Sequence, residues 1–471
     1  MTLILEYNSP ENEVENRTDE QTMEEKRNSA RYECKNCGLV VEMPKFSRQK
    51  KKCAECNGKL SRIVEARFCY DFVEPEKPIL TIEQVKEEIT KRFPDIWELV
   101  EPILCTYTTL SLKQLSGCPA LILVGKPAGE KTTALGFFYS VESSYVSDEF
   151  TPRAFVTHAA NLSPESLEEI DLLPRIVRKA LITAELAPLF SLQKDKLTEN
   201  LGTLTRVLDG EGYNKDSGVY GQRGYSGDYK FVWLGATTPI KNTIWQTMGS
   251  MGNRLFFLSV KDKERSNDDY VSMFTGKSYD QKCKECRGII KSFLDNHFKK
   301  YPIRDFEWVS KNEDVLKKII AYAQFLSKAR ASFSIWKSSD SSGDYDYNAP
   351  LFEEPPRIIN FLLNLAKGHA LINNREEICE EDLNVVKQVC LSSMPFDRYK
   401  LIQLLIKHDG TLSNELIRNE LGCSDEKARV VMNSLHILGI VDINHIPFGT
   451  EPGRPATVII LKDEWRQLLF A

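Results

Sequence analysis

Short runs of apolar residues, separated by longer polar or helical segments, dominate the middle of the chain. Each run is four to six residues long, and the five are Ala120–Val124, Ala154–Thr157, Ala180–Thr183, Phe231–Gly235 and Leu255–Val260. Continuous apolar runs of this length are typical of strands buried on both faces, as in a parallel sheet covered by helices. We therefore predict a multidomain α/β protein in which each run is one strand of a parallel sheet.

The segments on either side carry helical periodicity. Residues 66–118 repeat apolar positions at about helical spacing, namely Ile82, Val85, Ile89, Phe93, Ile96 and Val100. Residues 275–394 are predicted to be all-helical apart from an exposed loop at 338–347, and the last part of the chain to form three helices and a hairpin. The predicted domains are residues 1–30, 31–65, 66–274, 275–394 and 395–471.

Composition and charge narrow the class of protein. The chain has 471 residues, of which 42% are hydrophobic and 27% charged, so it is too long for one core and too apolar for wholesale disorder. Its net charge of −5 means that any contact with nucleic acid must be local. No apolar stretch reaches the ~18 residues that span a bilayer, and the first residues lack a signal peptide's pattern. We expect a soluble cytoplasmic protein with no membrane partner.

The first two segments have opposite charge. Residues 1–30 hold eight acidic and three basic residues, which predicts a disordered acidic tail. Residues 31–65 hold nine Lys and Arg against four Glu. The basic strip Lys45–Lys52 is either an edge that contacts phosphates or a solvated hairpin loop, and the pattern leaves both open.

Two close pairs of cysteines lie in residues 31–65. Cys34 and Cys37 form the first pair, Cys53 and Cys56 the second, and 15 residues separate the pairs. This spacing is that of a four-thiolate structural zinc site in a zinc ribbon, which leaves no open position for catalysis. Free thiols or a redox pair are the alternative.

The first apolar run is followed by Gly125–Thr132, which nearly matches a phosphate-binding loop. In such loops backbone N–H groups face the phosphates, the Lys reaches the terminal phosphates and the Thr binds Mg²⁺. The exception is Glu130, which stands where a glycine is expected. The residues predicted to bind Mg²⁺-ATP are Gly125, Pro127, Ala128, Gly129, Lys131, Thr132 and Thr133. The alternative is an ordinary strand-to-helix turn that contains a lysine.

Two later runs end in polar residues. Glu185 follows the run Ala180–Thr183 where a water-activating base is expected, whereas Ala184 occupies the place of a Mg²⁺-binding Asp. Glu185 is otherwise a cap for the following turn. Thr238, after the fourth run, is a candidate to sense the γ-phosphate, unless it and Thr237 only form a turn.

Two arginines are candidates for stabilising the charge of a transferring phosphoryl group. Arg254 directly precedes the fifth run. It either reaches the nucleotide of a neighbouring subunit or is an ordinary surface residue. Arg357 begins a predicted helix after two prolines, and it either contacts phosphate or is a solvated helix start.

The order of these motifs resembles the AAA+ ATPases, in particular the helicase clade with the minichromosome-maintenance and viral primase-associated helicases. The glycine-rich segment Leu208–Tyr225 resembles the hairpin with which those helicases contact a DNA strand in the pore of a hexamer. The resemblance assigns DNA contact to Lys215, Tyr220 and Arg223. It also implies a helical lid, a homo-oligomer such as a hexameric ring, and the cofactors ATP and Mg²⁺ beside the structural Zn²⁺. A flexible surface loop is the alternative for the hairpin.

Residues 395–471 resemble a winged helix. If it binds DNA, Lys427 and Arg429 face the major groove and Arg454, at the hairpin tip, touches the backbone or minor groove. The segment holds nine basic and ten acidic residues, and many winged helices bind protein instead. Protein partners through this module or the zinc ribbon therefore stay open.

These patterns predict an oligomeric AAA+ ATPase that acts on DNA, similar to a helicase or replication initiator. Glu130 and Ala184 depart from the nucleotide motifs, so the alternative is a hydrolysis-deficient, nucleotide-gated DNA-binding adaptor or transcription regulator. A third reading is a protein-remodelling ATPase.

Overall fold

The computed structural model describes residues 29–34, 40–44, 60–62, 80–157, 163–218, 221–261, 277–310, 312–338, 345–446 and 456–470, with four single positions between 265 and 276. The chain forms two compact units, Met1–Lys77 and Pro78–Ala471. In the first unit, β1 (Ser29–Cys34), β2 (Val40–Pro44) and β3 (Leu60–Arg62) form an antiparallel sheet in the order β2-β1-β3. The side chains of the four predicted zinc ligands and the basic strip lie outside the described residues.

The second unit is built on a five-stranded parallel sheet. Its strands are β4 (Ala120–Val124), β5 (Ser144–Val146), β6 (Ala180–Thr183), β9 (Val232–Thr237) and β10 (Phe256–Ser259). They pair in the order β10-β4-β9-β6-β5. The predicted α/β class and parallel sheet are confirmed.

One predicted strand is wrong. Residues 154–157 lie in and after a 3-10 helix, η2 (Pro152–Ala154), and the edge strand is β5 instead. Phe155 and Val156 are buried because they pack under the sheet, where the rings of Phe155 and Phe150 lie 5.3 Å apart. An edge strand such as β5 is only half covered, so it has no continuous apolar run to reveal it.

Helices cover both faces of the sheet. Leu121, Leu234 and Leu258 belong to an apolar cluster shared with α3, α4 and α11–α14, whereas Ile122, Trp233 and Phe257 pack on α6, α8 and α9. The helices up to the fifth strand are α2 (Ile82–Thr90), α3 (Trp97–Thr108), α4 (Lys131–Gly136), α5 (Pro164–Ile170), α6 (Leu172–Ile176), α7 (Ala187–Phe190), α8 (Lys194–Leu208) and α9 (Asn242–Met251), with the 3-10 turn η1 (Thr109–Ser111).

The helices that follow the sheet are α11 (Tyr279–Lys300), α12 (Glu313–Ala329), α13 (Pro356–Ile372) and α14 (Leu383–Ser392), with the 3-10 turn η3 (Glu380–Asp382). The loop expected at 338–347 is wrong for its last residues: Tyr345–Tyr347 form a short strand, β12, which pairs with β11 (Ile335–Lys337) just before the loop. Helix α13 crosses α3 closely, because a Cβ on Gly368 would lie 1.9 Å from the Cys105 carbonyl oxygen. Only glycine fits there.

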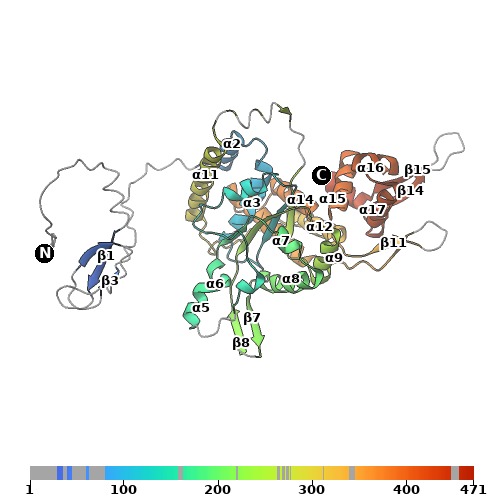
Figure 1. Cartoon of the computed structure of the whole chain (residues 1–471). Helices are drawn as coiled ribbons and strands as arrows, with labels where there is room; N and C mark the ends of the chain where they lie inside the picture. Colours follow the sequence, from blue (N-terminus) through green and yellow to red (C-terminus); the bar gives the residue numbers. More distant parts are fainter. Residues whose placement is uncertain are drawn as a thin grey trace. The chain divides into compact units, whose positions relative to one another are not determined.

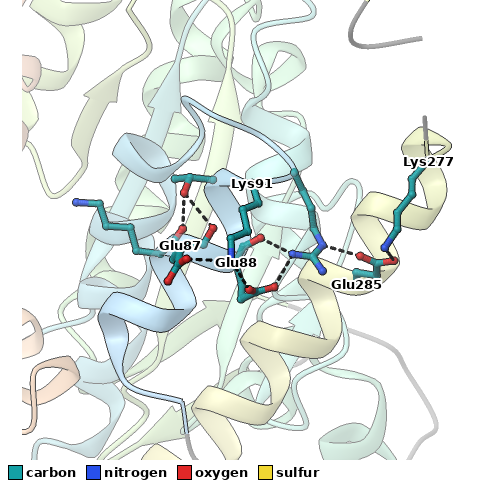
Figure 2. A network of polar contacts seen from close by, with 8 residues as sticks. Glu87, Glu88, Lys91, Lys277 and Glu285 are labelled. Atoms are coloured by element: carbon teal, nitrogen blue, oxygen red, sulfur yellow. Dashed lines mark hydrogen bonds and ion pairs between the residues drawn. The ribbon is translucent and has the colours of Figure 1, made fainter. Parts of the chain in front are cut away.

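A polar network joins α2 to α11 (Figure 2). Glu285 accepts hydrogen bonds from Lys277 and from Arg92, each at 2.6 Å. Arg92 also pairs with Glu88 on α2, and Lys91 pairs with both Glu87 and Glu88. The network fixes the first helix of this unit against the helices that follow the sheet.

A second network is buried between α13 and η3. Asp382 is fully buried and accepts hydrogen bonds from His369 Nδ1 at 2.5 Å, from both Nη atoms of Arg375 and from the Cys379 backbone. Burial by itself would lower the pKa of His369, but the hydrogen bonds and charges of Asp382 and Glu101 raise it to about 9. The charged imidazole is thus part of the folded state.

The last elements are α15 (Phe396–Lys407), β13 (Thr411–Ser413), α16 (Asn414–Leu421), α17 (Asp425–Ile437), β14 (Val441–Ile446), β15 (Ala456–Leu461) and α18 (Asp463–Phe470). The strands form an antiparallel sheet in the order β13-β15-β14. Ser424 caps α17, since its side chain accepts a hydrogen bond from the Lys427 backbone, whereas β13 and α18 were not predicted. Helix α18 packs on α12, where Tyr322 donates a hydrogen bond to the Leu468 carbonyl. Within the described ranges, every helix is too short or too polar to cross a membrane.

Candidate nucleotide-binding site

The predicted phosphate loop connects β4 to α4 at the carboxyl end of the sheet, the end at which open parallel sheets bind ligands. Ala128 and Glu130 have φ angles of 59° and 62°, and Gly129 between them does not share this left-handed backbone. A backbone that alternates between right-handed and left-handed conformations points successive N–H groups toward one concave side. Such a concavity favours the binding of an anion. At Gly125 a Cβ would lie 2.8 Å from the Val260 Cβ, so the loop passes tightly against the residue after β10.

Lys131 closes this loop. Its Nζ donates hydrogen bonds to the carbonyl oxygens of Gly125 at 2.8 Å and Lys126 at 2.6 Å. Only 7% of the residue is exposed. Burial lowers the pKa of Lys131, and the negative charge of Glu185 opposes that shift. The sheet therefore brings the predicted phosphate-binding lysine and the predicted base close enough to interact.

The neighbouring loop residues differ in their surroundings. Pro127, Ala128 and Thr132 are exposed. Thr133 is half-buried, and its hydroxyl lies 2.5 Å from the Tyr279 hydroxyl of α11. Of the two threonines, Thr132 is therefore the one whose side chain faces solvent at the mouth of the loop.

Glu130 is the residue that departs from the motif, and the backbone keeps the conformation of the missing glycine. A left-handed φ costs a residue with a Cβ about 1–2 kcal/mol, and glycine adopts it freely. We expect Glu130→Gly to raise ATP affinity several-fold, because it removes a carboxylate and a Cβ from the place where the backbone must approach the phosphates.

Glu130→Gln is the matched control for that prediction, since it removes the charge and keeps the Cβ. Calorimetric titration with ATP compares the three proteins. Equal affinity of Glu130→Gly and the unchanged chain would show that this position does not limit phosphate binding.

Glu185 follows β6 and is exposed. Its Oε1 accepts a hydrogen bond from the Ala187 backbone at 2.8 Å, so it does cap the following turn. Because its charge also acts on Lys131, the cap and the role of a base are compatible.

The end of β9 holds Thr237, which the sequence analysis considered only as a turn former beside Thr238. Thr237 is 1% exposed, and its Oγ1 has no hydrogen-bond partner among the described residues. Its carbonyl oxygen accepts a hydrogen bond from Gly125 at 3.3 Å, which places it beside the phosphate loop. Thr238, the predicted sensor, is half-exposed and lies one residue beyond the strand. The two adjacent threonines differ because β9 ends between them: Thr237 is its last residue, and Thr238 follows it.

Arg254 and Arg357 lie at the opposite, amino end of the sheet. Both line a cavity of about 300 Å³ together with Pro119, which precedes β4. Arg254 pairs with Asp209 at 3.1 Å, and Arg357 pairs with Glu353 at 3.2 Å. A Cβ on Gly252 would lie 3.1 Å from Arg254 Nη1 and 3.3 Å from Arg357 Nη1. The two guanidinium groups therefore converge, away from the phosphate loop of the same chain.

The predicted hairpin is present as β7 (Gly212–Ser217) and β8 (Gly221–Ser226), which project from the sheet in Figure 1. Arg223 and Tyr225 donate hydrogen bonds to Asp171 at 2.7 and 2.8 Å, and Asp171 is fully buried. Arg223, which stands opposite Lys215 in the hairpin, thus ties β8 to the buried Asp171. Lys215 lies over the Tyr213 ring at 5.3 Å, and Tyr220 is outside the described residues.

The basic residues predicted on the third C-terminal helix are paired. Lys427 lies 3.5 Å from Asp397 of α15, and Arg429 pairs with Asp425 at 2.7 Å. Lys427 is still half-exposed, whereas Arg454 falls outside the described ranges.

Among the described residues, no group of three or more His, Cys, Asp or Glu side chains is arranged to hold a metal ion. The four predicted zinc ligands fall outside that set. Thr132, with the loop, is the residue that would hold Mg²⁺ with a nucleotide, and Glu185 is the residue that would orient the attacking water. The class that the fold defines is an α/β protein built on a five-stranded parallel sheet. No family model matches the chain, and no curated protein matches it.

Proposed function

We propose that this chain is an ATP-binding protein of the AAA+ type, with Mg²⁺-ATP phosphates on Gly125–Thr132. The observation that carries the proposal is the loop itself, with its alternating backbone and the buried Lys131 held on loop carbonyls. Glu185 orients the attacking water, and Thr237 or Thr238 contacts the γ-phosphate. Helices α11–α14 act as the lid, residues 31–65 as a zinc ribbon on Cys34, Cys37, Cys53 and Cys56, and residues 395–471 as a winged helix.

The two arginines support a homo-oligomer. Arg254 and Arg357 converge at the amino end of the sheet, whereas the phosphate loop lies at the carboxyl end. One chain therefore does not offer both ends to the same phosphate. In the proposal, both arginines act on the nucleotide of a neighbouring subunit, as in a closed ring.

The partner is DNA, bound through the hairpin. Lys215, the aromatic Tyr213 beneath it and the tip around Tyr220 supply the charge and ring faces that sequence-independent strand binding needs. Arg223 positions the hairpin through Asp171 instead of touching DNA directly. Lys427, Arg429 and Arg454 contribute a second, weaker surface.

A second candidate function is a nucleotide-gated DNA-binding adaptor that hydrolyses ATP slowly or not at all. The left-handed Glu130 in the phosphate loop and Ala184 in place of an acidic residue favour it. In that case the binding of the nucleotide, without its hydrolysis, changes the conformation of the protein.

Hydrolysis of ATP with and without single-stranded DNA tests the function. We expect turnover that DNA stimulates, and turnover lost in Glu185→Gln with ATP binding kept, because the amide still accepts the Ala187 hydrogen bond. Glu199→Gln, exposed on α8, is the matched control. ATP binding without turnover would favour the adaptor. Absence of ATP binding would contradict both functions.

A further inference from the structure

A cavity of about 310 Å³ adjoins the phosphate loop. The carboxyl ends of β4 and β10 form one wall, including Gly125, Lys126 and Val260, and helix α15 of the C-terminal elements forms the other. Its volume is within the range of small-molecule pockets, about 300–1,000 Å³. Gly125 and Lys126 are also the residues whose carbonyl oxygens hold Lys131, so the cavity lies against the first two residues of the phosphate loop.

Helix α15 presents aromatic, amide and cationic groups to this cavity, since Lys400 also lines it and its Nζ lies 5.3 Å from the centroid of the Phe396 ring. Phe396 and Tyr399 lie one turn apart, with ring centroids 6.4 Å apart, and Gln403 lies one turn further along. Phe396 is 43% exposed, so part of its ring is open to solvent. An aromatic face stacks on a nucleobase, and an amide pairs with its donor and acceptor edge. Such a set suits a flat heteroaromatic ring better than a sugar or an aliphatic ligand.

We propose that α15 closes the nucleotide site by binding the base, with Phe396 stacked on a purine and Gln403 on its polar edge. This inference rests on the proposed function, since the phosphates of the same nucleotide lie on Gly125–Thr132. The base then joins the parallel sheet to the C-terminal elements.

Asp397, the residue next to Phe396, contacts two other helices. Asp397 accepts a hydrogen bond from Asn242 of α9 at 3.3 Å and pairs with Lys427 of α17 at 3.5 Å. Asp397 therefore links the start of α15 both to α9 and to α17, the helix predicted to face DNA.

Calorimetry with two ligands tests the proposal. Mg²⁺-ATP carries the base, and inorganic tripolyphosphate with Mg²⁺ offers phosphates alone. We expect Phe396→Ala to weaken ATP binding about tenfold, the loss of one stacked base, and to leave tripolyphosphate binding unchanged. Phe470→Ala, which removes a similarly exposed aromatic residue from α18, should change neither affinity.

Each other result is decisive. If the unchanged chain binds both ligands equally, or if Phe396→Ala leaves ATP binding intact, the base pocket is overturned while the proposed function stands. Equal weakening of both ligands also overturns it, because Phe396 then acts through the loop. If neither ligand binds the unchanged chain, the proposed function itself fails. Should Phe396→Ala not fold, Gln403→Ala at a half-exposed position must show the same selective loss.

Discussion

Lys131→Ala is expected to weaken ATP binding by about 100-fold, roughly 3 kcal/mol, which is the scale of a lost charge-assisted contact to phosphate. Lys131 is buried and its Nζ is held at the phosphate loop by two carbonyl oxygens, so no other described side chain takes its place there. Titration calorimetry with Mg²⁺-ATP measures the loss. Lys113→Ala, which removes an exposed lysine paired with Glu307, should bind ATP normally.

The control for folding is the melting temperature, because Lys131 also holds the loop carbonyls together. An alanine variant that melts like the unchanged chain and binds ATP equally well would remove the phosphate loop from the proposal.

The same variant tests whether subunits share a site. Lys131→Ala and Arg254→Ala should each lack hydrolysis, and mixing them should restore part of it, because the first can lend Arg254 to the second. Arg206→Ala is a matched control, since Arg206 pairs with the same Asp209 but is exposed. No restoration in mixed oligomers would mean that Arg254 acts within its own chain or only in folding.

Asp382→Asn is expected to lower the free energy of unfolding by about 3–5 kcal/mol, the usual cost of removing one partner from a buried ion pair. The change leaves the cations of His369 and Arg375 without the carboxylate that both contact. Thermal or urea unfolding followed by circular dichroism measures it. Asp314→Asn breaks an exposed pair with Lys317 and should leave stability nearly unchanged. A similar small effect at Asp382 would contradict the role of the network.

The pH dependence of stability gives an independent check. The folded-state pKa of His369 is raised to about 9 from 6.5, so its stabilising charge is fully present below pH 6.5 and is lost as the pH rises to 9. The unchanged chain should lose stability over that interval. In Asp382→Asn that loss should be much smaller, so the gap between the two proteins should narrow toward pH 9.

Several features could be predicted because they depend on local sequence. Four of the five apolar runs are strands, since a strand covered on both faces must be apolar throughout. The glycines around residues 208–225 indicated the hairpin, and Gly212 is required there because a Cβ would lie 2.1 Å from the Tyr225 carbonyl oxygen. The third predicted C-terminal helix begins directly after Ser424, a residue type that caps helix starts through a local hydrogen bond.

Other features depend on contacts between residues far apart in the chain. The edge strand β5 escaped prediction because one-sided burial leaves no apolar run. The hydrogen bond from Arg223 to Asp171 could not be predicted, because Asp171 lies 52 residues earlier in the chain. The convergence of Arg254 and Arg357, and the meeting of α15 with the phosphate loop, have no local signal at all.

By itself, the sequence determined the α/β class, the parallel sheet, the loop on β4 and the hairpin, because burial period, glycine geometry and capping act over a few neighbouring residues. The tertiary structure decided which end of the sheet each charged residue occupies, which cations are already paired and which helix faces the nucleotide loop. These depend on strand order and helix packing, which join residues separated by more than a hundred positions, such as Arg254 with Arg357 and Val260 with Phe396.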